Sequence, residues 1–517
     1  MLSTSNILII DYGSQYTQVI ARKIREFGVS AYIEHFDITK ETIVNHQPSG
    51  IILAGGPDSS YSANAPQLPL GIFDMEVPIL GICYGMQIMT IALGGKVERG
   101  IQHEFGLVKS QVICDNSLLL ANIQPKKSNV LDVWMSHTDQ VTDLPQEFNI
   151  ILSTDNTPVT AIENIEKQIY GVQFHPEVSH CEGGDAILHN FVYKICQCTL
   201  SWKPQLTVDK RINEIKNTVG NDEVILATSG GVDSTVVACL LHQAIGNNLK
   251  CIFIDNGLLR QNEVTKVKEM FVRLGIKLNV LDASDLFLTK LSGVTDPETK
   301  RKIIGNTFIE CFEAESKKFS TANWLAQGTI YPDVIESAAV GKNTAVIKTH
   351  HNVGGLPQDM NLKLIEPIKD LFKDEVRKLA HSLDIPADLF NRHPFPGPGL
   401  AVRIMGDIKP EYLHILRQAD AIYLEELKKS GWYQNSSQAF CVFLPIKSVG
   451  VTGDGRSYGY VIAIRAVQTQ DFMTANYAPI PHDILGKISS RIINEVKEVA
   501  RVVLDISSKP PATIEWE

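Results

Sequence analysis

The sequence lacks any apolar run near the roughly 20 residues that a helix needs to cross a bilayer. Residues 1–6 have no basic region, and the apolar stretch after them is too short for a signal peptide. Positive charge is not in excess either. The net charge is −10 at pH 7, which disfavours a protein whose main ligand is nucleic acid. We therefore expect a cytoplasmic chain that binds neither a membrane nor a nucleic acid.

Cysteine is sparse and follows no metal-binding pattern. Nine cysteines are spread over 517 residues, and the only close pair is Cys196 and Cys198. Without C-x-x-C repeats, a structural zinc site is not predicted, and we expect reduced thiols, most of them buried. An alternative set of metal ligands would be His175, His180, Cys181 and His189. The spacing of these residues matches no standard zinc site.

What is present is an ordinary globular composition, 44% hydrophobic and 21% charged. At roughly 150 residues per domain, this length predicts about three domains. Short apolar strands, such as 7–10 and 50–53, alternate with helical segments, which predicts a parallel sheet covered on both faces. The pattern restarts after Pro204, with strands near 223–227 and 250–254.

A third region follows the rigid run H-P-F-P-G-P-G-L at 393–400, which neither a helix nor a central strand would tolerate. Beyond it, strand-like and helical segments are mixed. The predicted fold class is therefore α/β, with two doubly wound parallel-sheet domains followed by a small α+β domain. The expected bounds are 1–200, 201–392 and 393–517.

The first chemical motif is G-I-C-Y-G at 81–85, between a predicted strand and helix. Such a turn exposes Cys83 above the sheet, and the helix N-terminus favours its thiolate. His175 and Glu177 follow another strand and could supply a base and its orienting group. Gly55-Gly56 follows a third strand and could offer N–H donors to an oxyanion. Each motif alone could instead be purely structural, a buried thiol or a surface turn. All three are expected at one edge of the sheet, however, which favours a catalytic site.

The second motif is S-G-G-V-D-S at 229–234, again between a strand and a helix. Glycines in this position expose N–H groups at the positive end of a helix, which is a phosphate site. The Walker lysine is absent. Mg²⁺ is expected with the triphosphate, and Asp233 is a candidate ligand, although capping of the helix is an equal alternative. Lys348, in a basic glycine-ended loop, and Lys369 are candidate phosphate contacts, and the loop length suits a lid.

Residues 1–200 resemble a triad-type glutamine amidotransferase domain, with Cys83 as nucleophile, His175 as base and Glu177 as orienting group. The resemblance implies that the Gly56 and Tyr84 N–H groups form the oxyanion hole. The loop at 229–234 resembles the PP-loop of ATP pyrophosphatases. The residues that would bind ATP are Ser229, Gly230, Gly231, Val232, Asp233, Ser234 and Thr235.

The order of these domains, together with H-P-F-P-G-P-G-L and the terminal K-P-P-A-T-I-E-W-E, resembles the GMP synthetase family. That resemblance implies glutamine, ATP and XMP as substrates, Mg²⁺ as cofactor, and a homodimer formed by the third domain. The residues that match its XMP-binding positions are Arg301, Gln438, Lys509 and Glu515.

Two other functions are alternatives. A tRNA-modifying ATP pyrophosphatase would need a basic face and a reactive cysteine near the phosphate loop. Cys239 and Cys251 are close in sequence, but they fall within a predicted helix and strand. A non-catalytic scaffold is the other alternative, and the presence of Cys83, His175 and Glu177 argues against it.

Overall fold

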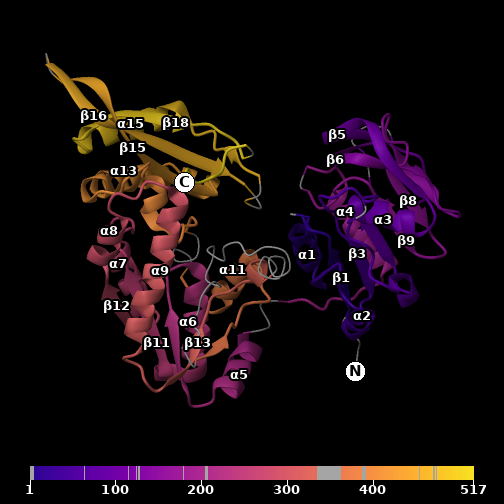
Figure 1. Cartoon of the computed structure of the whole chain (residues 1–517), viewed down its shortest axis with the longest axis horizontal. Coiled ribbons are helices and arrows are strands. Elements are labelled where there is room, and N and C mark those ends of the chain that lie inside the picture. The colour runs from indigo at the N-terminus through magenta and orange to yellow at the C-terminus, as the bar shows by residue number, and fades with distance from the viewer. Residues whose placement is uncertain are drawn as a thin grey trace. The chain divides into compact units, whose positions relative to one another are not determined.

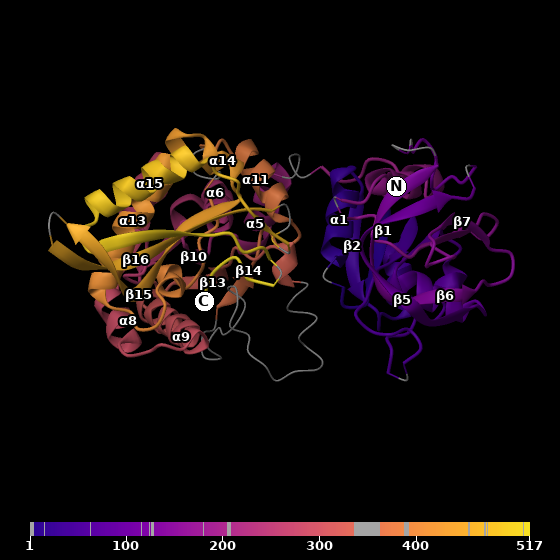
Figure 2. The same ribbon diagram turned by 90° about the horizontal axis from the view of Figure 1, so that it is seen from above.

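The structure is a computed structural model, and its contacts divide the chain into two compact units, 1–203 and 204–517. Figures 1 and 2 show the two units in views 90° apart. The residues that the structure describes are 5–517 apart from 15, 63, 115, 124, 126–128, 179, 204–207, 335–361, 387–391, 453–454, 470–471, 473 and 510.

A nine-stranded sheet forms the centre of the first unit. Its first five strands are parallel, and the others continue the sheet by antiparallel pairing. In spatial order the strands are β2 (Ser30–His35), β1 (Asn6–Asp11), β3 (Gly50–Leu53), β4 (Ile79–Ile82), β9 (Ile169–Val172), β8 (Ala161–Asn164), β7 (Asn149–Ser153), β5 (Lys96–Val112) and β6 (Val130–Asp143).

Helices cover both faces of the parallel part of this sheet. The four residues Ile7 to Ile10 on β1 are all fully buried, although successive side chains of a strand point to opposite faces. On one face, Leu8 and Ile10 share a core with Ile43 and Met86 from two of the helices. The helical segments are α1 (Thr17–Glu26), α2 (Lys40–His46), η1 (Ile72–Met75), α3 (Tyr84–Ala92), α4 (Gly184–Asn190) and η2 (Phe191–Ile195).

The second unit begins with a five-stranded, fully parallel sheet. In spatial order its strands are β12 (Leu278–Asp282), β11 (Leu249–Asp255), β10 (Glu223–Ala227), β13 (Ala322–Ala326) and β14 (Lys363–Ile365). The helical segments are α5 (Val208–Val219), α6 (Val232–Ile245), η4 (Gly246–Asn248), α7 (Glu263–Arg273), α8 (Ser284–Leu291), α9 (Pro297–Ser316), α11 (Lys373–Ser382) and η5 (Gly399–Arg403).

A smaller sheet follows, in which a long hairpin of β15 and β16 pairs with β17 in antiparallel and with β18 in parallel fashion. Two helices, α13 and α15, contact each other and pack on this sheet (Figures 1 and 2). The elements are α13 (Pro410–Lys429), α14 (Trp432–Asn435), β15 (Gln438–Thr452), β16 (Gly455–Gln468), β17 (Asn476–Tyr477), α15 (His482–Glu495) and β18 (Val499–Asp505).

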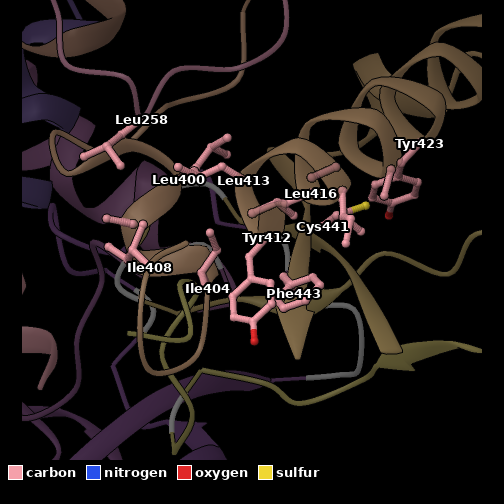
Figure 3. Packing of buried hydrophobic residues seen from close by; sticks show 14 of the residues in the cluster. Leu258, Leu400, Ile404, Ile408, Tyr412, Leu413, Leu416, Tyr423, Cys441 and Phe443 are labelled. Atoms are coloured by element: carbon pink, nitrogen blue, oxygen red, sulfur yellow. The ribbon is translucent and has the colours of Figure 1, made fainter. Parts of the chain in front are cut away.

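One apolar core joins the parallel sheet to this smaller sheet. Leu258, which follows β11, belongs to the same buried cluster as Leu400, Ile404 and Leu413, and Figure 3 shows these side chains together. The ring of Tyr412 on α13 stacks on Phe443 of β15, with centroids 4.6 Å apart. The rigid H-P-F-P-G-P-G-L run therefore leads into η5 in the middle of a continuous core.

The expected fold class is confirmed: the sheets contain large parallel parts, and a small region with antiparallel strands ends the chain. The antiparallel strands from β5 to β8 were not predicted. The helix after the phosphate loop begins at Val232 rather than near Thr235. In the described residues, no helix has the length and apolar character needed to cross a membrane.

Candidate active sites

Cys83 lies on the turn between β4 and α3, in a backbone conformation that L-residues rarely adopt, with φ of 50° and ψ of −108°. Strain of this kind costs on the order of 1–3 kcal/mol and occurs mainly at functional sites. The start of α3 packs so closely on β3 that only glycine fits at position 85: a Cβ on Gly85 would lie 2.2 Å from the carbonyl oxygen of Leu53 on β3. The Cys83 amide donates to Val172 O on β9 at 2.7 Å, which ties the turn to the neighbouring strand.

His175 and Glu177 follow β9, which is parallel to β4 and next to it, so they reach the same sheet edge as Cys83. The His175 Nδ1 and Glu177 Oε1 atoms are 2.8 Å apart. Both side chains are almost fully buried. Burial lowers the pKa of His175, but the charge of Glu177 and the hydrogen bond and charge of Cys83 outweigh it and raise the pKa to about 10. The arrangement favours the protonated, imidazolium form of His175.

The glycine turn after β3 lies against this pair. A Cβ on Gly55 would be 3.1 Å from His175 Cε1, and a Cβ on Gly56 would be 3.2 Å from Tyr84 Cγ. Only residues without side chains fit so close to both partners. The turn thus brings the Gly56 backbone and the first residue of α3, Tyr84, to one place beside Cys83. That their N–H groups bind an oxyanion stays a prediction.

In the second unit, the loop at 229–234 joins β10 to α6. Gly230 has φ of 71°, in the left-handed region that glycine adopts without strain. Hydroxyls brace the loop: Thr228 Oγ1 donates to Ser234 Oγ at 3.1 Å, and Thr235 Oγ1 donates to Gly231 O at 2.7 Å. The N–H groups of the first turn of α6 have no acceptor within the helix, so this helix start can bind an anion.

Asp233 forms an ion pair with Lys373 at the start of α11, through its Oδ2 atom. Its other carboxylate oxygen, Oδ1, is buried and has no hydrogen-bond partner among the described residues. The alternative role as helix cap is wrong, because the cap of α6 is Gly231 and makes no side-chain bond there. Nowhere in the described residues do three or more His, Cys, Asp or Glu side chains gather as a metal site.

Two of the four residues expected to bind XMP lie in contact. Gln438 Nε2 donates to Glu515 Oε1 at 2.7 Å, and Arg403, which the sequence reasoning missed, also holds Glu515. Arg301 forms an ion pair with Glu298 at 2.6 Å. The Lys509 ammonium donates to Phe472 O at 2.8 Å.

Of the two lysines expected at the phosphates, the structure describes only Lys369. Lys369 is exposed on the turn after β14. Lys348 lies outside the described residues.

Comparison with known proteins gives three family models that match parts of this chain. The model of class-I glutamine amidotransferases matches residues 8–195, that of NAD synthase matches 207–307, and that of the GMP synthase C-terminal domain matches 425–516. A GMP synthase [glutamine-hydrolyzing] of Photorhabdus laumondii is 55% identical over 99% of this chain and 98% of its own length. One from Haemophilus influenzae is 55% identical with the same coverage.

The chain belongs to the family of glutamine-hydrolysing GMP synthases. A solved structure of a putative GMP synthase subunit from Thermoplasma acidophilum is also similar, with 28% identity and a TM-score of 0.33. The match covers 38% of this chain and 96% of that one.

The sequence analysis missed several polar residues around Cys83. Gln87 on α3 donates to Asp139 O at 2.8 Å, and Gln173 Nε2 approaches Cys83 Sγ at 3.6 Å. The buried Asp139 carboxylate accepts hydrogen bonds from Ser59 and Tyr61. Gln87 is the one amide side chain on a largely apolar helix, and that contrast could have identified it. Asp139 carries no such local signal.

Proposed function

We propose that this chain hydrolyses glutamine to glutamate and ammonia and uses ATP to convert XMP to GMP, releasing AMP and pyrophosphate. The observation that carries the proposal is the combination of two sites in a full-length relative of GMP synthases. One is a strained cysteine beside a buried His–Glu pair, and the other is a glycine loop at a helix start. Neither alone would identify an ammonia-dependent ligase.

In the glutaminase reaction we assign Cys83 as the nucleophile. Its thiolate attacks the carboxamide carbon of glutamine, and the Gly56 and Tyr84 N–H groups stabilise the oxyanion that forms. His175, held by Glu177, donates its proton to the departing nitrogen, so that ammonia leaves and a γ-glutamyl thioester remains. His175 then takes a proton from water, which attacks the thioester and releases glutamate. The raised pKa of His175 suits the proton-donating step.

In the synthetase reaction we assign residues 229–235 to the phosphates of ATP. The XMP oxygen at C2 attacks the α-phosphorus, pyrophosphate leaves, and ammonia then displaces AMP from the adenylate. Mg²⁺ would neutralise the pyrophosphate charge. The buried, unpartnered Oδ1 of Asp233 fits one carboxylate ligand, and Mg²⁺ typically takes one or two carboxylates plus phosphates and water. Lys348 and Lys369 would contact the phosphates.

For XMP we propose binding by Arg301, Gln438, Lys509 and Glu515. The contact of Gln438 with Glu515 supports a shared site, since a fixed carboxylate can accept N–H groups of a purine base. Arginine and lysine suit the 5′-phosphate. We also propose a boundary near residue 392, a homodimer formed through residues 393–517, and a cytoplasmic location.

The decisive experiment compares wild type with Cys83→Ala, using XMP and Mg-ATP with either glutamine or ammonium. We expect the variant to lose glutamine-dependent GMP formation and to keep ammonium-dependent formation, because the two reactions use different units. If wild type makes no GMP from either donor, the acceptor assignment is wrong. If the variant keeps glutamine use, the assignment of Cys83 is wrong.

A further inference from the structure

Cys196 and Cys198 are the only two cysteines close together in the sequence, and neither reaction described above uses them. They directly follow the helical segment η2 (Phe191–Ile195) of the first unit. The Cys196 amide donates to Phe191 O at 2.8 Å, and the Cys198 amide donates to Val192 O at 3.0 Å. Gln197 between them has φ of 53°, in the left-handed region. This tight turn fixes the backbone of both cysteines.

The turn brings the two thiols together. Cys196 and Cys198 are hydrogen-bonded through their side chains, and Cys198 also bonds Ser49. The hydrogen bond from Cys196 lowers the pKa of Cys198, against the opposing effect of burial, and the bond from Ser49 adds to it. The Cys196 thiol beside it therefore makes Cys198 easier to ionise than a free cysteine. Cys198 is 6% exposed and Cys196 is half-buried, and burial raises the pKa of the Cys196 thiol well above its usual range.

The pair lies at the sheet edge opposite the glutaminase site. A Cβ on Gly50 would lie 2.3 Å from Cys196 Sγ, so this sulfur sits on the first residue of β3. Gly55 and Gly56, which face His175 and Tyr84, follow the other end of the same strand. Cys196 thus lies at the start of β3, whereas the glutaminase site lies beyond its end.

We propose that Cys196 and Cys198 are a dithiol site that peroxide oxidises to an intramolecular disulfide. The Cys198 thiolate attacks one oxygen of hydrogen peroxide, and the O–O bond breaks. This gives a sulfenic acid and a hydroxide, which takes up a proton to become water. The Cys196 sulfur then attacks the sulfenic sulfur, the S–O bond breaks, and a second water leaves. The two sulfurs lose two electrons and peroxide gains them. Reversible disulfides of this kind in reducing compartments are typically redox-sensing.

Mass spectrometry of the wild-type full chain tests the proposal directly. Both cysteines lie in one tryptic peptide, Ile195–Lys210, because Lys203 precedes Pro204. The chain is treated with hydrogen peroxide, its remaining thiols are blocked with N-ethylmaleimide under denaturing conditions, and it is digested. We expect this peptide to be two hydrogens lighter and unblocked. Dithiothreitol given before blocking should restore two blocked thiols.

Matched controls decide whether the disulfide depends on this geometry. Cys239 and Cys251 are buried, and burial raises the pKa of each to about 12, so both should stay blockable. Cys196→Ser and Cys198→Ser should each abolish the lighter species. The proposal is overturned if the wild-type peptide keeps two blocked thiols at a peroxide dose that oxidises Cys83. It is also overturned if either cysteine forms only disulfides between chains.

Discussion

Arg403 on η5 donates two parallel hydrogen bonds to the carboxylate of Glu515, from Nε to Oε2 at 3.0 Å and from Nη2 to Oε1 at 2.8 Å. The Arg403 side chain is fully buried, and its guanidinium lies 4.2 Å from the centroid of the Phe440 ring. A charge buried in this way is tolerated only when it is paired in good geometry. Arg403 therefore fixes the orientation of the Glu515 carboxylate, with Gln438 as a further donor.

Arg403→Lys should weaken XMP use without affecting ATP or glutamine. Lysine keeps the charge but lacks the planar fork that fixes both oxygens of Glu515. We expect the KM for XMP to rise about tenfold, which corresponds to about 1.4 kcal/mol, while the KM for ATP and the glutaminase rate stay unchanged. Steady-state kinetics with each substrate varied would measure this. Arg501→Lys, at an exposed bond to Ser448, is the control, and an unchanged KM for XMP in Arg403→Lys would contradict the positioning role.

The pH dependence of glutamine hydrolysis should follow His175. Its folded-state pKa is raised to about 10, so the imidazolium contributes stability in full below its unfolded pKa of about 6.5. That contribution is lost as the pH rises through about 10. The glutaminase rate should fall over the same upper limb, because the neutral ring cannot protonate the departing ammonia. Glutamate release, measured across pH in buffers of constant ionic strength, would show it.

The variant Glu177→Gln distinguishes the titration of His175 from alkaline denaturation of the protein. Removing the carboxylate removes the principal charge that raises the pKa of His175, so the alkaline limb should move to lower pH and the rate should fall. The exposed Glu166→Gln should leave the profile unchanged. An alkaline limb at the same pH in Glu177→Gln and wild type would show that His175 does not set it.

Asp233→Asn tests the assignment of a metal ligand. If its buried Oδ1 binds Mg²⁺ with the triphosphate, the variant should need several-fold more Mg²⁺ for half-maximal ammonium-dependent GMP synthesis. The glutaminase rate should not change. Asp209→Asn, an exposed residue in the first turn of α5, is the control. A slower variant with the wild-type Mg²⁺ dependence would leave Asp233 only as the partner of Lys373.

Much of the parallel architecture could be predicted, because it is encoded in short local runs. Strand β1 is four consecutive isoleucine or leucine residues after Asn6, all buried, which is typical of a strand covered on both faces. The pair of β5 and β6 could not be predicted in this way. Strand β5 contains Gly100, Gly106 and several charged residues, and its strand character depends on pairing with β6 along a register with bulges.

The residues of the candidate sites also fall into those that a local sequence pattern predicts and those that only the packed structure brings together. Cys83, His175 and the 229–234 loop could be located from sequence because each sits on a turn directly after a strand. Asp139 approaches Gln87 only because β6 passes beside α3. Arg403 meets Glu515 across 112 positions of sequence. Contacts of this range depend on the packed core rather than on any local pattern.

Gly85→Ala should damage the glutaminase site alone. The added Cβ would lie 2.2 Å from Leu53 O and 2.6 Å from Leu53 C. Backbone atoms cannot yield as a flexible side chain can, so α3 must shift and carry the Cys83 turn with it. We expect a loss of about 1–3 kcal/mol of stability in the first unit and at least a tenfold lower glutaminase rate, with ammonium-dependent GMP synthesis retained.

Gly486→Ala is the matched control, because it lies within α15 and an added Cβ there would meet nothing within 4 Å. Alanine in an exposed helix interior is more stable than glycine by about 1 kcal/mol. This variant should therefore be slightly more stable, with unchanged activity from both nitrogen donors. Calorimetry and paired assays with glutamine and ammonium would compare the two variants. A Gly85→Ala enzyme with wild-type glutaminase kinetics would show that the close packing of α3 on β3 does not hold Cys83 in its strained conformation.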